Sequence, residues 1–406
     1  MYKRQALSRA DADGVHPKQR DYAWGVLAAA CERIARSDSV SSDHTVEEFV
    51  KNVLLEASRH PEPTPCPEHD SRFDEHPSWG GFKPRTEAAQ GLIVLVRHAD
   101  LATSDVIDAV ERLSADPVPA VRFHIANRLN VLYRTAPEVM WRIIERMCRE
   151  EQSRGVLQGL ITGPLHRLAG AHPERITRLT KQIFDRVTQG AGAKEVRGFC
   201  IGIFTGLYIW RDNSTCREII SGIVADPVTN SDEAGHVLQH LREPLTYGPV
   251  DPSDPHKDAV RKRAFDLLRR LLRSAHDRLH QREEAHAGRS LPTWPKEEQE
   301  KVAALLRIID TLAKQVYYAS GAFDRKKGRK IATRKPLTRE QERFYRESAA
   351  LIDELAEVGL RSVAHHLLEM LEVFIPLDPR DVFCLLYTSD AADEGLGVDL
   401  GGRRII

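Results

Sequence analysis

The sequence lacks a long apolar run. Its longest strongly apolar stretch, Phe199–Trp210, is shorter than the roughly 20 residues that a membrane-spanning helix needs. The N-terminus, MYKRQALSRADADGV, has no apolar segment typical of a signal peptide. We therefore expect no membrane association and a cytoplasmic location.

An excess of charge of one sign is also missing. The chain has 59 lysines and arginines and 59 aspartates and glutamates, so its formal net charge is zero. This balance gives nucleic acids and anionic membranes no overall attraction, and any such partner must be recognised by a local cluster. The hydrophobic fraction of 41% suits a folded chain and argues against disorder over its whole length.

Cysteine is sparse and has no paired spacing. The six cysteines are Cys31, Cys66, Cys148, Cys200, Cys216 and Cys384. Several lie on apolar helix faces, where cysteine acts as a small hydrophobic residue. Their scatter predicts reduced thiols and no disulfide framework.

Motifs for catalysis and cofactors are absent from the sequence. It contains neither a G-x-x-x-x-G-K-[ST] phosphate loop nor a G-x-S-x-G nucleophile turn. His276 and His280 share a helix face but lack the glutamate that H-E-x-x-H supplies as a general base. The pairs His236/His240 and His365/His366 are interpreted in the same way. We predict no catalytic residue, cofactor or metal here, although an active site in a missing part of the polypeptide stays an open alternative.

Segment 60–85 is rich in proline, histidine and acidic residues. His60, Cys66, His69 and His76 could ligate a metal, but their spacing matches no zinc template and includes a single thiolate. We therefore interpret the segment as an irregular surface loop.

What the sequence does contain is helical periodicity, clearest in Ala115–Tyr133, ADPVPAVRFHIANRLNVLY. Asp116-Pro117 ends the preceding helix, because proline disfavours the α conformation in the residue before it. Apolar residues spaced by three and four then form one stripe of a predicted helix: Val118, Val121, Ile125, Leu129 and Leu132. We expect Leu129 to be buried, and Arg128 and Arg134 to be more exposed.

Asp116 and Arg122 lie six residues apart across this turn. The pair resembles the second half of a HEAT repeat, in which a turn aspartate and an arginine six positions on form a ladder between stacked helix pairs. The string VRFHIANRLNVLY at Val121 is echoed by VRGFCIGIFTGLYI at Val196, and steps of roughly 35–40 residues suit such units. The resemblance implies an all-α fold: a HEAT-like α-solenoid of stacked antiparallel helix pairs with a C-terminal helical subdomain.

The expected organisation has five parts. Residues 1–59 form an N-terminal helical segment with Trp24, Leu27 and Ile34 in its core, and residues 60–85 the irregular loop. Residues 86–248 form the repeats, with one helix kinked at Pro164, and residues 249–383 the C-terminal subdomain. The strings MYKRQ and 384–406 resemble translated sequencing-adapter read-through, which implies a fragment of a longer protein with a non-native tail.

Positive charge gathers on the helix predicted over His256–His286 and in a loop over residues 323–336. The cations that we assign to partner or nucleic-acid binding are Arg261, Lys262, Arg263, Arg269, Arg270, Arg273, Lys326, Lys327, Arg329, Lys330, Arg334 and Lys335. They either neutralise phosphates or pair with acids within the fold.

Two functions are compatible with these features. The first is a protein-interaction scaffold or sensor arm of a larger bacterial multidomain protein, for example of the defence or signalling NTPase type. Its second helices would line a surface for a protein partner or for missing domains of the same polypeptide. The alternative is a nucleic-acid-binding helical-repeat module that uses the basic C-terminal helices.

Overall fold

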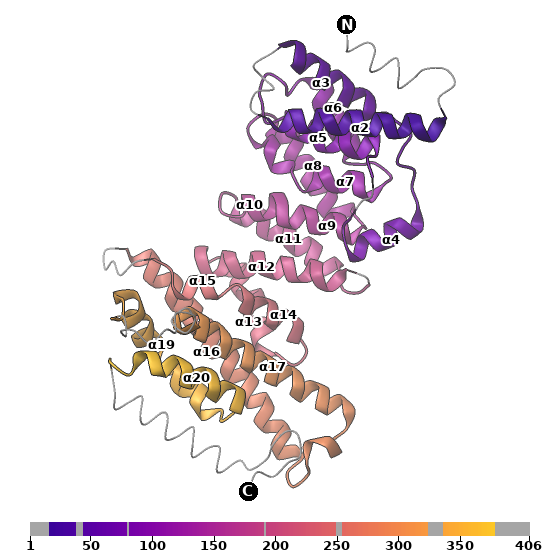
Figure 1. Cartoon of the computed structure of the whole chain (residues 1–406). Coiled ribbons are helices and arrows are strands. Elements are labelled where there is room, and N and C mark those ends of the chain that lie inside the picture. The colour runs from indigo at the N-terminus through magenta and orange to yellow at the C-terminus, as the bar shows by residue number, and fades with distance from the viewer. Residues whose placement is uncertain are drawn as a thin grey trace, which may run out of the picture. The chain divides into compact units, whose positions relative to one another are not determined.

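The computed structural model describes residues 16–37, 44–78, 81–190, 192–248, 254–323 and 336–377. Every regular element in these ranges is a helix, which confirms the all-α fold (Figure 1). The chain divides into two compact units, Met1–Ile203 and Phe204–Ile406. The predicted boundaries at residues 85 and 248 each fall inside one of these units. None of the described helices is long and apolar enough to cross a membrane.

Unit 1 is built from helices in two rows. One row contains α5 (Pro84–Leu95), α7 (Pro119–Ala126) and α9 (Arg154–Leu160), which pack on one another in that order. The other contains α8 (Pro137–Glu150) and α11 (Pro173–Arg186), which also pack together. The remaining elements are α2 (Pro17–Arg36), α3 (His44–Ala57), α4 (Pro67–Glu75), α6 (Ser104–Leu113), η2 (Leu129–Tyr133), η3 (Ile161–Leu165), α10 (His166–Leu168) and the first part of α12 (Ala193–Arg211).

Proline and acid begin several of these helices, as the sequence indicates. Pro137 with Glu138 opens α8, and Pro173 with Glu174 opens α11. Proline needs no amide partner in the first turn, and an acid there complements the positive end of the helix dipole.

The stretch Ala115–Tyr133 differs from the single helix that we predicted. Helix α7 ends at Ala126, and the chain continues as the 3₁₀ helix η2. The break lies where η3 comes close, since a Cβ built on Gly163 would lie 2.2 Å from the carbonyl oxygen of Asn127. The apolar stripe nevertheless stays buried, and Leu129 has no exposed surface while Arg134 is exposed and Arg128 half-buried.

The interpretation of segment 60–85 as irregular throughout was wrong, because it contains α4. This helix packs on α7 and α9. Its Phe73 is buried, with its ring centroid 5.7 Å from that of Phe123. Tertiary packing therefore stabilises a helix that is short and polar in sequence.

Helix α2 packs on α5. Trp24 is buried as predicted, but Ile34 is 39% exposed and its assignment to the core was wrong. The buried face instead includes Ala28, Cys31 and Ala35, which follow Trp24 at helical spacing. Ile34 precedes Ala35 by one residue, which turns it about 100° away from this face.

At Pro164, where we predicted a kink, the α-helical hydrogen-bonding pattern changes. Helix α9 gives way to η3, a π-helical segment that contains Pro164, and the chain then resumes as α10. A wider turn of this kind relieves the clash between the proline ring and the preceding turn.

Unit 2 contains longer helices. The second part of α12 is followed by α13 (Ser214–Ala225), α14 (Ser231–Gln239), α15 (Arg242–Leu245), α16 (Pro255–Ala285), η4 (Leu291–Thr293), α17 (Lys296–Ala319), α19 (Arg339–Glu357) and α20 (Arg361–Phe374). Helix α16 packs on α17 and α19, and α17 packs on α20. A capping box begins α19, in which the side chains of Thr338 and Gln341 each accept a hydrogen bond from the other residue's backbone N–H.

Four of the cysteines behave as small hydrophobic residues. Cys31, Cys148, Cys200 and Cys216 are buried free thiols, and burial raises the pKa of Cys31 to about 12. Cys66 is partly exposed, and Cys384 lies outside the described residues.

Candidate functional site

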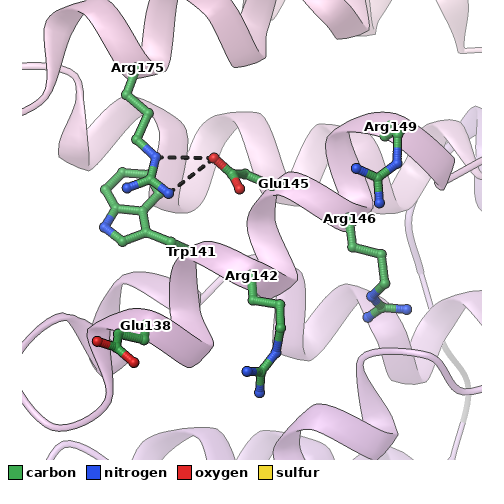
Figure 2. Close-up of a pocket in the computed structure, with 7 residues that line it drawn as sticks. All are labelled: Glu138, Trp141, Arg142, Glu145, Arg146, Arg149 and Arg175. Atoms are coloured by element: carbon green, nitrogen blue, oxygen red, sulfur yellow. Dashed lines mark hydrogen bonds and ion pairs between the residues drawn. The ribbon is translucent and has the colours of Figure 1, made fainter.

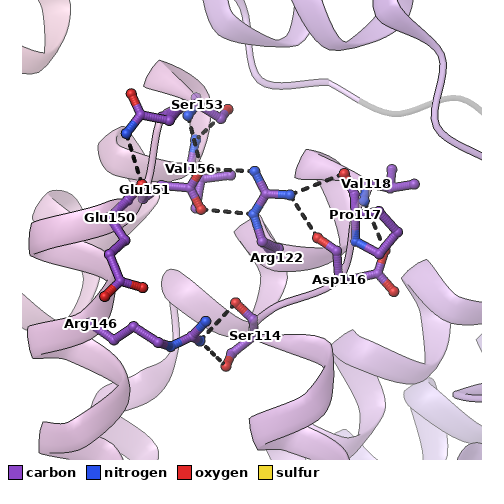
Figure 3. Close-up of polar contacts among 12 residues, drawn as sticks. Ser114, Asp116, Pro117, Val118, Arg122, Arg146, Glu150, Glu151, Ser153 and Val156 are labelled. Carbon is purple, nitrogen blue, oxygen red and sulfur yellow. Dashed lines mark hydrogen bonds and ion pairs between the residues drawn. The ribbon is translucent and has the colours of Figure 1, made fainter.

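Arginine–acid bridges tie consecutive turns of unit 1 together, and Figure 3 shows the one that joins Arg122 to Glu151. The carboxylate of Asp116 accepts hydrogen bonds from Nε of Arg85 at 2.8 Å and from its Nη2 at 3.1 Å. It also accepts the backbone N–H of Val118 at 2.9 Å. Asp116 thus joins the start of α5 to the turn that precedes α7.

Arg122 makes the next bridge. Its Nε and Nη2 donate to the two carboxylate oxygens of Glu151 at 2.7 and 2.8 Å, while Nη1 donates to the main-chain carbonyl of Asp116 at 2.7 Å. Glu151 accepts the backbone N–H of Ser153 at 2.8 Å. Asp116 and Glu151 therefore follow the same pattern. Each accepts a hydrogen bond from the backbone N–H two residues further along the chain, and each forms an ion pair with an arginine of an earlier helix.

This pairing differs in detail from the one that the resemblance implied. Arg122 bonds to the backbone of Asp116, and the two side chains find their charged partners elsewhere. Burial alone would lower the pKa of Arg122, but the hydrogen bonds and charge of Glu151, with Asp116 and Asp70 nearby, raise it above its usual value. We call the two bridges, Arg85–Asp116 and Arg122–Glu151, the ladder.

Helix α4 lies beside the ladder. Asp74 accepts hydrogen bonds from Oγ of Ser153 at 2.5 Å and from the backbone N–H of Gly155 at 3.2 Å. Burial, and then the charge of Asp74, raise the pKa of Asp70 against the lowering effect of Arg122. The sequence does carry a signal for α4, because Pro67 followed by Glu68 is the same helix start as Pro137 followed by Glu138 in α8.

A groove lies on the other row of unit 1, on α8 and α11 (Figure 2). Its volume is about 490 Å³. The lining side chains are Glu138, Trp141, Arg142, Glu145, Arg146, Arg149 and Arg175. We call this surface the arginine groove. The groove has no clear signal in the sequence, because the arginines of α8 alternate with acids and form no run.

The floor of the groove is organised by Arg175. Its guanidinium carbon lies 3.9 Å from the ring centroid of Trp141, and its Nη2 donates to Glu145 at 3.0 Å. Arg178 also donates to Glu145, at 3.1 Å. Burial acts to raise the pKa of Glu145, but these hydrogen bonds outweigh it and lower the pKa below its usual value.

The rim is formed by three arginines of α8. Arg142 pairs with Glu111 and Arg149 with Glu150, and the two arginine side chains are 59% and 66% exposed. Arg146 donates through Nη2 to the backbone carbonyl and the hydroxyl of Ser114, at 3.1 and 2.6 Å. The groove thus combines two arginines that are held in place, Arg146 and Arg175, with two solvated ones, Arg142 and Arg149.

In unit 2, several arginines that we assigned to partner binding are engaged within the fold. Arg261 is buried and bonded to Glu347, to Asp258 and to the carbonyl of Tyr247. Arg263 donates to the carbonyl of Ile209 at 2.8 Å.

Arg269 and Arg273 both donate to Glu354 of α19. Lys262 and Arg270 are exposed. The remaining assigned cations, Lys326, Lys327, Arg329, Lys330, Arg334 and Lys335, lie outside the described residues.

In the part of the chain that the structure describes, no three histidine, cysteine or acidic side chains lie close enough together to hold a metal ion. His280 lies 3.3 Å from Glu284 on the surface of α16. His60 lies 3.5 Å from Asp21.

Two buried acids meet between α2 and α5. Glu32 and Glu87 are both buried, Arg36 donates to Glu32, and Gln90 donates to Glu87 at 3.5 Å. Burial, and then the charge of Glu32, raise the pKa of Glu87 to about 7, against the opposing effect of Arg33 and Arg36. Glu87 therefore titrates near neutral pH.

Comparison with known proteins adds no assignment. No family model and no curated protein matches the chain. A crystal structure of an engineered protein is similar over 98% of this chain and 100% of its own, with 13% sequence identity and a TM-score of 0.28. A likeness this low carries no argument about fold or function.

Proposed function

We propose that this chain is a protein-interaction scaffold or sensor arm, built as a HEAT-like α-solenoid with a C-terminal helical subdomain. In this proposal it is part of a larger bacterial multidomain protein of the cytoplasm. The ladder is the observation that carries it. Helical-repeat scaffolds are stabilised by contacts between neighbouring units, and their extended surfaces bind partners.

The arrangement of the ladder supports this view. Arg85 and Asp116 are 31 residues apart, and Arg122 and Glu151 are 29 apart, so each bridge spans about one helix pair. The same bond pattern at successive turns keeps the units in register. It leaves the outward side chains of α8 and α11 free to vary with a partner.

Photo-crosslinking of the full chain in its native cell tests the proposal. A photo-reactive amino acid is placed at Glu138 of α8 and at Gln182 of α11, both exposed, and at the exposed Thr162 of η3 in the other row. Tyr22 of α2 is the control position. We expect one discrete protein adduct at Glu138 and at Gln182 but not at Tyr22.

The other results have distinct meanings. An adduct at Thr162 alone would keep the scaffold but move its contact to the second helices. No adduct above the Tyr22 control at any position would contradict the scaffold function.

The alternative function, nucleic-acid binding through the basic C-terminal helices, keeps limited support. Arg261, Arg263, Arg269 and Arg273 already have partners within unit 2. A duplex-binding surface there would depend on Lys262 and Arg270 and on cations outside the described residues. Its signature would be an affinity for duplex DNA that falls steeply with salt and is lost in Lys262→Glu/Arg270→Glu.

A further inference from the structure

We propose that the arginine groove binds an acidic segment of a protein partner. This inference rests on the proposed scaffold function and specifies the chemistry of the partner. The groove lies on α8 and α11, the first helices of their pairs, rather than on the second helices that the sequence favoured.

The cations of the rim have a regular spacing. Arg142, Arg146 and Arg149 follow one another at four and three residues, so they share one face of α8 (Figure 2). At about 1.5 Å of rise per residue, neighbouring arginines are about 4.5–6 Å apart along the helix axis. In an extended peptide, side chains on one face recur about every 6.6 Å. Acids at alternate positions of such a peptide match the row of arginines.

The groove already binds one carboxylate, which comes from its own chain. Glu145 is held by Nε and Nη2 of Arg175, at 3.2 and 3.0 Å, and by Arg178 at 3.1 Å. Stacking over Trp141 fixes the plane of the Arg175 guanidinium. This arrangement shows that the local geometry suits a carboxylate.

The rim arginines are available for exchange. The ion pairs Arg142–Glu111 and Arg149–Glu150 are solvated, so either arginine can turn to another carboxylate without stranding a buried charge. Arg146 is held in place by two hydrogen bonds to Ser114. Among the described contacts, both use only Nη2 of Arg146, so the other guanidinium N–H groups can donate to a ligand.

The acids of the groove favour a peptide over a nucleic acid. Glu138 lies at one end and Glu145 in the centre, beside the arginines. A phosphate backbone carries uniform negative charge and would be repelled there. A peptide can place neutral or basic residues opposite Glu138 and carboxylates opposite the arginines, which is electrostatic complementarity of the usual protein–protein kind.

The test measures fluorescence anisotropy with the full chain. The probe is a labelled peptide in which glutamate alternates with serine, and its controls are the glutamine version of the peptide and a labelled single-stranded oligonucleotide. Arg142→Glu/Arg149→Glu is compared with Lys262→Glu/Arg270→Glu, which changes the net charge equally at exposed positions in unit 2. We expect the groove variant to lose at least about tenfold in peptide affinity and the control variant to lose none.

Several results would overturn the proposal. The two variants could lose peptide affinity equally, or the glutamine peptide could bind as well as the glutamate peptide. The oligonucleotide could bind to the groove more tightly than the peptide does. The glutamate peptide could also fail to bind the wild-type chain at about 1 mM. If the double reversal lowers the melting temperature, Arg149→Gln removes one exposed arginine and should still weaken peptide binding about threefold. A partner cross-linked at Thr162 together with no peptide binding would retain the scaffold and reject the groove.

Discussion

The two units of this chain use arginine in different ways. In unit 1, Arg122 bonds to one carboxylate, Glu151, and to backbone carbonyls of its own turn. In unit 2, Arg261 bonds to two carboxylates, Asp258 on its own helix and Glu347 of α19. The first pairing joins residues 29 apart and the second joins residues 86 apart.

This difference indicates what each network does. A bridge between neighbouring turns fixes the spacing of stacked helices. When its arginine is lost, no second guanidinium takes its place. A bridge between distant helices secures one long helix against another, and the second acid makes it tolerant of loss.

The largest effect should come from the apolar core. Leu129 is fully buried in unit 1, and Leu271 is fully buried in unit 2. Leu129→Ala should lower the free energy of unfolding by about 2–5 kcal/mol, through lost transfer energy and a cavity. Leu271→Ala is the matched variant and should cost a similar amount, since hydrophobic burial does not depend on the polar network. Urea denaturation followed by circular dichroism measures both, and a loss below about 1 kcal/mol for Leu129→Ala would contradict its placement.

Breaking the ladder should have the next largest effect. Arg122→Met leaves the carboxylate of Glu151, whose side chain is 5% exposed, without its guanidinium partner. We expect a loss of about 3 kcal/mol, because a buried charge is left uncompensated. The same urea titration measures it.

The matched change in unit 2 is Glu347→Gln. Arg261 keeps Asp258 and the carbonyl of Tyr247, so we expect a loss of about 1 kcal/mol. Equal losses in Arg122→Met and Glu347→Gln would break the contrast between a single and a redundant partner.

The smallest effect is a pH dependence within unit 1. The folded state raises the pKa of Glu87 from 4.5 to about 7, so it binds this proton more tightly than the unfolded chain does. The stability that this carboxyl contributes is therefore fully present below about pH 4.5 and is lost as the pH rises through about 7.

Thermal melts at about pH 5 and about pH 8 measure this effect. The melting temperature of the wild-type chain should fall relative to that of Glu87→Gln as the pH rises. Parallel profiles for the two proteins would show that Glu87 does not titrate in this range.

The sequence predicted the fold class and most helices because their signals are local. Apolar residues at three- and four-residue spacing, proline in the first turn and the Thr338/Gln341 box depend only on neighbours in the chain. Pro137 and Pro173, for example, lie in the first turns of α8 and α11.

The candidate site could not be predicted in this way. The arginine groove needs α8 and α11 to lie side by side, and the spacing of Arg175 and Trp141 in the sequence does not reveal their stacking. The basic residues of α16 looked available in the sequence, but Arg261, Arg269 and Arg273 meet acids of α19 only in the folded chain.

Most of the helices and the apolar stripe through Leu129 follow from the sequence alone, which also singles out Asp116 and Arg122 as polar residues of one turn. Tertiary structure alone decided which partner each charge meets, where α7 breaks, and that α4 forms at all. The reason is physical. Helix formation and the burial of an apolar stripe follow from contacts within a few residues of the chain. The strength of an ion pair and the direction of a pKa shift depend instead on which distant side chain lies beside the charge in surroundings of low dielectric constant.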